Sequence, residues 1–134
     1  MGTPLNTIEK AMKDLLEANS GFMTACKGGV HNWVPEKPTY PYARLGDAFE
    51  QKFNTFGRNG KTTEVVLHIF SQYNGDYEAQ NLVNLADNIL DDATLNLTGW
   101  TPVLISWEST EIVTDDDGRT KHTMVIYRII TQEG

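Results

Sequence analysis

Cysteine and basic residues are both scarce in this sequence, and each shortage restricts what the protein can be. Among 134 residues Cys26 is the only cysteine, so no internal disulfide can form. A catalytic thiol would also need a histidine and an orienting partner brought to it by the fold. Lys and Arg number 11 against 18 Asp and Glu, which gives a net charge of -7. Because affinity for nucleic acid comes largely from clustered basic side chains, this balance disfavours a surface that grips DNA.

Long apolar runs are also missing. Nowhere do roughly 18 apolar residues occur together, so no membrane-spanning helix is expected. The first residues lack a basic stretch followed by an apolar run, and we therefore expect no signal peptide and folding in a reducing cytoplasm. A length of 134 residues with 40% hydrophobic content predicts one domain over residues 1–134.

Patterns that carry chemistry are absent as well. His31, His68 and His122 have no Cys, Asp or second His at metal-ligand spacing, which favours structural roles for all three. The run Asp115–Gly118 resembles the start of a calcium loop but lacks the bidentate Glu near the loop's end. We interpret it as a tight turn. The sequence therefore predicts no catalytic residue, no cofactor and no metal.

Helical spacing predicts two helices. The first covers about residues 4–19, and its apolar stripe is formed by Leu5, Ile8, Met12, Leu15 and Leu16. The second begins at Asp76, a suitable cap, and continues to about Leu90. Between the first helix and residue 41, two adjacent glycines and three prolines remove all periodicity. Residues 20–41 are therefore expected to form a long irregular arm.

The remaining segments favour strands. Apolar and β-branched residues predict strands over about residues 42–49, 62–73, 102–114 and 120–132. The polar segment 51–61 is expected to be a long loop between the first two. Gly46 suggests a bulge, and a change of parity near Ser109 suggests another.

The resulting order, α-β-β-α-β-β, predicts an α+β fold. Its natural architecture is a four-stranded, mainly antiparallel sheet with two helices packed on one face, plus long mobile loops. Apolar and aromatic residues occur on both parities of the last three strands. We therefore expect the second face of the sheet, or part of it, to be covered by the arm or by another subunit.

Several short motifs resemble the tail completion proteins of siphophages. In that family a strand ends in an aromatic residue and Ser, a Gly and an acidic helix start follow, a Leu-x-Leu-x-Gly comes after the helix, and an Asp-rich turn precedes the last strand. Pro-Tyr and Leu-Gly-Asp patterns lie upstream. The matching segments here are Pro41-Tyr42, Leu45–Asp47, Phe70-Ser71, Gly75, Leu95–Gly99 and Asp115–Gly118. No single motif is specific for the family. Their order and spacing over about residues 41–131 are specific when taken together.

This resemblance implies a mixed α/β subunit similar in fold to the tail terminator of lambda-like phages. It implies a hexameric ring at the head–tail interface of the virion, assembled in the host cytoplasm. The ring would cap the tail tube protein, dock onto the head completion (stopper) protein and let DNA pass through its centre. A monomeric free subunit, which a tail end would template into the ring, is compatible with this. The family has no known catalytic residue, so no enzyme is expected.

The arm and the loop are the expected contact surfaces of the ring. A ring needs a heterologous interface that closes, and the two helices are needed for the subunit's own core. We therefore assign a subunit or partner interface, as a hypothesis, to Trp33, Phe53, Phe56, Arg58 and Lys61. In the alternative interpretation one Phe packs back on its own core.

Two other functions stay open on sequence alone. One is a small ligand-binding or enzymatic α+β domain with a cleft under the arm. The other, within assembly proteins, is the tail terminator proper or a stopper or adaptor of the head connector.

Overall fold

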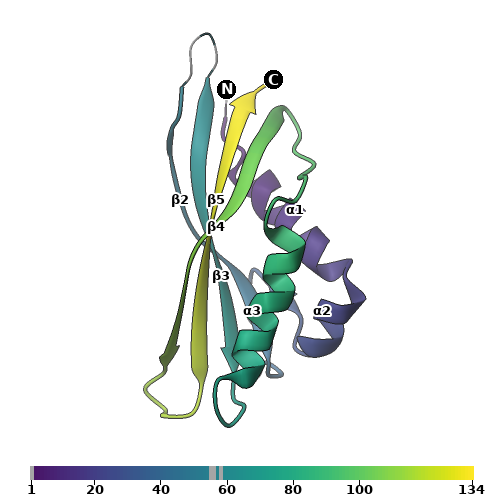
Figure 1. Cartoon of the computed structure of the whole chain (residues 1–134), viewed down its shortest axis with the longest axis vertical. Helices are drawn as coiled ribbons and strands as arrows, with labels where there is room; N and C mark the ends of the chain where they lie inside the picture. Colours follow the sequence, from purple (N-terminus) through teal and green to yellow (C-terminus); the bar gives the residue numbers. More distant parts are fainter. Residues whose placement is uncertain (1, 55–56, 58) are drawn as a thin grey trace.

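A long, twisted sheet with helices packed on one side forms the framework of the protein (Figure 1). The computed structural model describes residues 2–54, 57 and 59–134. In chain order the elements of this part are α1 (Leu5–Glu17), α2 (Ser20–Ala25), β1 (Val30–His31), β2 (Tyr42–Lys52), β3 (Gly60–Ser71), α3 (Tyr77–Leu90), β4 (Trp100–Thr114) and β5 (Lys121–Glu133).

The sheet has five strands in the described residues, in the order β1-β2-β3-β5-β4. The β1 strand runs parallel to β2, and every other neighbouring pair is antiparallel. The α+β class is thus confirmed, whereas the expected count of four strands is wrong. The added strand, β1, pairs through only Val30 and His31, and two residues are too few to produce a periodic pattern.

The helices were predicted closely. The α1 stripe buries Ile8, Met12 and Leu16 completely, and α3 buries Leu82 and Leu90. These side chains meet the alternate residues of the central strands that point toward the helices, namely Val65, Leu67, Ile69, Val125, Tyr127 and Ile129. Burying one such aliphatic side chain stabilises the fold by about 1.5–3 kcal/mol. Both expected bulges are present, as register shifts between Gly46 and Phe49 and between Trp107 and Ser109.

The segment 20–41 is more ordered than its composition predicts. It contains a third helix, α2, whose cap Asn19 accepts a hydrogen bond from the Phe22 backbone at 2.8 Å. Phe22 is fully buried. Farther on, a Cβ on Gly28 would lie 1.8 Å from the Thr39 carbonyl oxygen, so the chain returns against itself where only glycine fits. The irregular part shrinks to residues 32–41.

The loop between β2 and β3 is also shorter than expected. Strand β2 continues to Lys52 and β3 begins at Gly60, so several polar residues of the predicted loop belong to strands. The Phe53 backbone N–H donates to the Gly60 carbonyl at 2.9 Å, which extends the pairing beyond β2. This end of the sheet projects past the helices, so solvent surrounds both of its faces (Figure 1). The strand residues here are therefore polar, and a polar segment has the composition of a loop.

Candidate assembly surface

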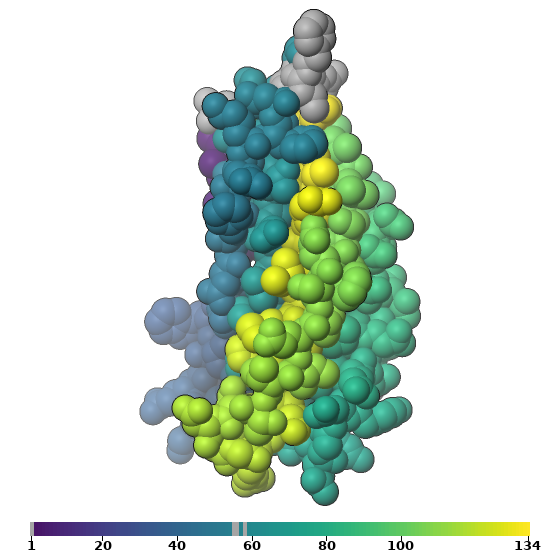
Figure 2. Space-filling view, turned by 60° about the vertical axis from the view of Figure 1, so that its left-hand side comes forward, coloured from purple at the N-terminus to yellow at the C-terminus, as the bar shows by residue number. Residues whose placement is uncertain are grey.

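The face of the sheet opposite the helices carries a row of stacked rings. The Tyr42 and Phe70 rings lie 4.8 Å apart between centroids, and the Phe70 and His122 rings lie 4.4 Å apart. Figure 2 shows this side, where β5 lies between β3 and β4 without a helix over it. Most of its apolar side chains are half-buried by their own neighbours. Aromatic stacking therefore replaces part of the cover that helices give the other face.

A polar cluster crosses the same face. Asp47 lies at the bulge of β2, with a carboxylate oxygen 3.1 Å from Nη2 of Arg44 and 2.7 Å from Nε2 of His68. On the other side of its ring, His68 Nδ1 is 2.7 Å from His122 Nε2. His122 Nδ1 lies 3.9 Å from Asp115. The cluster therefore links three strands and the turn between β4 and β5.

Burial and hydrogen bonding determine the charges in this cluster. Burial lowers the pKa of both His68 and His122 below the ordinary value, so neutral imidazoles are favoured. The hydrogen bond from Arg44 lowers the pKa of the Asp47 carboxyl, which stays ionised. One neutral imidazole can donate to the other. The Asp47 carboxylate lies close to His68 Nε2, but the geometry there is not that of a hydrogen bond. This network orients side chains across the strands. None of its members is a nucleophile of the kind that catalysis uses.

Other groups with catalytic potential are unsuitable. Burial raises the pKa of the Cys26 thiol to about 12, so the thiol remains protonated and unreactive. Among the described residues, no three His, Cys, Asp or Glu side chains are arranged to hold a metal ion. Within the same part of the chain, no helix has the length and apolar character that crossing a membrane requires.

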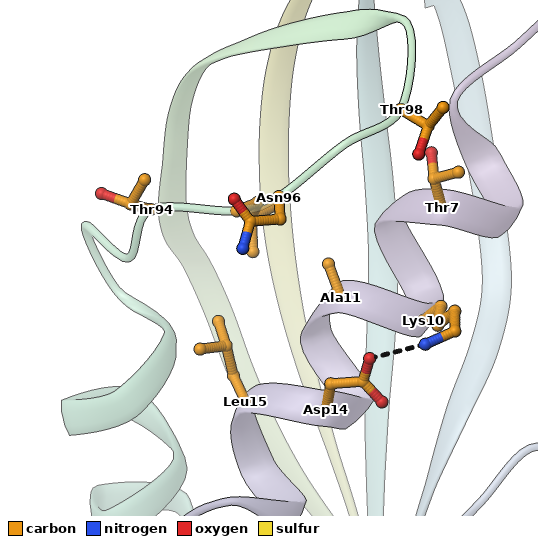
Figure 3. A pocket seen from close by; sticks show the side chains of 9 residues that line it. Thr7, Lys10, Ala11, Asp14, Leu15, Thr94, Asn96 and Thr98 are labelled. Atoms are coloured by element: carbon orange, nitrogen blue, oxygen red, sulfur yellow. Dashed lines mark hydrogen bonds and ion pairs between the residues drawn. The ribbon is translucent and has the colours of Figure 1, made fainter.

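A shallow recess of about 360 Å³ lies between α1 and the connection from α3 to β4 (Figure 3). Its wall on α1 includes Ala11 and Leu15, and the ion pair between Lys10 and Asp14 at 2.8 Å lies on the same helix. Thr94 and Asn96 face it from the connection. Both members of the ion pair are more than half exposed, so the recess holds no desolvated charge of the kind that active sites use.

The residues that the sequence analysis assigned to the interface do not lie together in the structure. Trp33 is 88% exposed in the irregular segment after β1, and Phe53 is 42% exposed just past the end of β2. Lys61 is half-buried in β3, paired with Lys52. Phe56 and Arg58 lie outside the described residues. Because β1 pairs with the start of β2, Trp33 and Phe53 flank opposite ends of a strand about 35 Å long. They therefore belong to two separate surfaces.

The interface residues assigned from sequence do not include an exposed apolar surface on β4. Strand β4 forms one edge of the sheet and exposes Val103, Leu104, Trp107 and Val113. The sequence pattern assigned these residues to a strand, and apolar strand residues are usually read as core. Apolar residues on both parities of the last three strands did indicate a second face that needs cover, but this signal did not single out β4 or these residues. Exposed apolar patches of this kind commonly mark interaction surfaces.

Comparison with known proteins identifies the family. The family model described as "Tail completion protein gp17" matches residues 10–132. The chain belongs to this tail completion family. The family is one of structural phage tail proteins, so the chain is a component of phage tail assembly and not an enzyme. The motif order along residues 41–131 predicted this family, and the prediction is confirmed. Among curated protein sequences none matches the chain.

Solved structures share the fold of this tail completion protein. A chain titled "Virion of native gene transfer agent (GTA) particle" matches with a TM-score of 0.90 and 15% identity, over 98% of this chain and 99% of that one. The "Structure of bacteriophage SPP1 gp17 protein" matches with a TM-score of 0.63 and 23% identity, over 96% and 95% of the two chains. Length and overall pattern predict a likeness to the tail-to-head joining protein of Bacillus phage SPP1, and the match to gp17 of SPP1 confirms the resemblance.

Proposed function

We propose that this tail completion protein assembles as a hexameric ring that caps the tail tube and joins it to the head connector, with DNA passing through the ring. The observation that carries the proposal is the family match over residues 10–132. The high structural similarity to a chain of a virion particle supports it, because that likeness extends over 98% of this chain. The ring has a tail tube protein on one side and a head completion (stopper) protein on the other.

The surface of the subunit suits assembly better than ligand binding. The recess between α1 and the α3–β4 connection is shallow and carries an exposed ion pair. By contrast, large apolar side chains are exposed at several separate places, among them the surroundings of Trp33, Phe53 and Trp107. A heterologous ring contact requires different patches on each subunit, and docking to tube and stopper requires further ones. Separate exposed patches meet this need.

The net charge of the chain also supports a channel through which DNA passes. Six copies at -7 each carry six times -7, or -42, before counterions. Negative side chains repel phosphates, so an acidic channel wall would let DNA slide without sticking. A basic channel in a map of the assembled ring would contradict this part of the proposal.

The direct test uses tails purified from phage particles that lack this protein. We expect the added chain to bind one end of each tail, to appear there as a ring in electron micrographs and to allow those tails to join DNA-filled heads. Binding to the head connector in the absence of tails would instead indicate a stopper or adaptor. Failure to bind either structure would refute the proposal.

A further inference from the structure

The edge strand β4 has a free side over its second half. Strand β4 pairs with β5 alone, and it ends the sheet on that side. Near its middle, the connection after α3 occupies the edge: the Asp92 N–H donates to the Ile105 carbonyl at 3.1 Å, and the Trp107 N–H donates to Asp91 at 3.0 Å. After the bulge, residues 109–114 have strand partners only in β5. Alternate residues of such a strand direct their backbone N–H and C=O groups away from the sheet.

Devices that normally protect an edge are few here. Natural sheets block their edges with lysine, proline, bulges or a covering segment. Between Ser109 and Thr114 the strand has no lysine and no proline, and its one acidic side chain is Glu111. Trp107 lies just before this free edge and Val113 lies within it, and 47% and 36% of their surfaces are exposed. Six free residues match the usual length of a strand in globular proteins.

The charge of this edge selects its partner. From Trp100 to Gly118 the sequence has five acidic residues and no lysine or arginine. Glu108 is bound by Arg128 at 3.0 Å, whereas no basic side chain among the described residues pairs with Glu111. Two β4 strands placed edge to edge would bring like charges together, which destabilises cross-strand pairs. A basic strand would gain both backbone hydrogen bonds and opposite charge.

A second copy of this chain cannot supply such a strand from its other edge. Strand β2 is free where β1 does not cover it, and this part carries Asp47, Glu50 and Lys52. Its net charge is therefore negative, like that of β4. We propose that the free edge of β4, from Ser109 to Thr114, binds an extended basic segment of a different protein by adding it to the sheet as a further strand. The inference does not require the proposed ring, since the isolated subunit already presents this edge.

The probe for this test is a capped peptide of about seven residues that alternates lysine with valine and threonine. Isothermal titration calorimetry with the full chain should detect binding, and hydrogen exchange should slow at residues 109–114. A peptide of identical charge, N-methylated at every residue, has no backbone N–H on either edge to donate to β4 and should bind about tenfold more weakly. Equal binding of both peptides would mean that only charge attracts them, and it would overturn the proposal.

Charge variants supply the matched comparison. Glu111→Lys should weaken binding of the unmethylated peptide about fivefold, because a like charge then faces the lysines. Glu36→Lys makes the same change at an exposed site after β1 and should alter binding by less than about twofold. Equal weakening by both variants, protection elsewhere in the chain, or concentration-dependent pairing of the chain through residues 109–114 would each refute the proposal. The peptide comparison uses the unmodified chain, so it remains decisive even if the Glu111→Lys variant does not fold. If the peptide does not bind, the proposed capping of tails is unaffected.

Discussion

His68 and His122 lie side by side on β3 and β5, with Nδ1 of one 2.7 Å from Nε2 of the other. They are 54 residues apart in sequence, and only the pairing of the two strands brings them together. A carboxylate oxygen of Asp47 lies 2.7 Å from Nε2 of His68. A half-buried histidine pair of this kind is stable when neutral, because two charged imidazoles at this distance repel each other.

The first prediction is a loss of stability in mild acid. Burial lowers the pKa of both histidines below the ordinary value of 6.5, so the unfolded chain binds protons at a higher pH than the folded one. The free energy of unfolding should be fully retained above about pH 6.5 and decrease as the pH falls toward the folded pKa values, by at most roughly 1.4 kcal/mol per pH unit for each histidine. Urea unfolding between pH 7.5 and 5 measures the slope.

The matched variants for this prediction lie on the same face. His68→Gln with His122→Gln should flatten the slope in that pH range. Met124→Leu, which changes a residue paired with His68 and leaves both imidazoles, should preserve the slope. A slope that survives the double substitution would assign the pH dependence to other groups.

The second prediction concerns the buried hydroxyl of Tyr127. This side chain is fully buried, and its hydroxyl donates to Asp87 of α3 at 3.1 Å, which ties the helix to β5. Tyr127→Phe should lower the free energy of unfolding by about 1 kcal/mol, since one hydrogen bond is lost and the ring is kept. Thermal unfolding measures the loss. Tyr73→Phe, at a ring that is 46% exposed, is the control and should change little.

The third prediction tests the close approach at Gly28. A Cβ there would lie 1.8 Å from the Thr39 carbonyl oxygen and 2.9 Å from that of Pro41. Because both atoms belong to the backbone, Gly28→Ala should displace residues 39–41, break the hydrogen bond from Gly28 to Pro41 and destabilise the fold by about 2 kcal/mol or more. Gly2→Ala, where a Cβ meets nothing within 4 Å, is the control. Equal melting temperatures for the two variants would contradict the prediction.

The fourth prediction concerns the exposed aromatic residues in assembly. If Trp33 and Phe53 contact neighbours in the ring, Trp33→Ser and Phe53→Ser should each reduce binding to tail ends about tenfold or more without changing the melting temperature of the free subunit. Counting capped tails in electron micrographs measures the effect. Tyr77→Ser removes a ring that is 71% exposed at the start of α3 and provides the control. Unchanged capping by the Trp33 and Phe53 variants would remove these residues from the interface.

Two parts of the candidate assembly surface, around Trp33 and around Phe53, could be predicted from the sequence, whereas the part around Trp107 could not. Trp33 and Phe53 attracted notice because large apolar side chains occur there in polar surroundings, and both are exposed. Trp107 gave no such signal, since it lies in a strand among other apolar residues. Whether a strand residue is buried depends on which neighbours flank that strand, and the edge position of β4 follows from the order of the whole sheet.

The sequence by itself determined the two long helices α1 and α3, the long strands, the bulges and the family. These features rest on short-range patterns, such as the stripe from Ile8 to Leu16 or the turn Asp115–Gly118, and local spacing specifies them. Only the tertiary structure decided that residues 20–41 form α2 and β1, that Trp33 and Phe53 lie on separate surfaces, and that β4 is left as a free edge. Each of these depends on contacts between residues distant in sequence, and hydrophobic periodicity carries no information about which strands become neighbours.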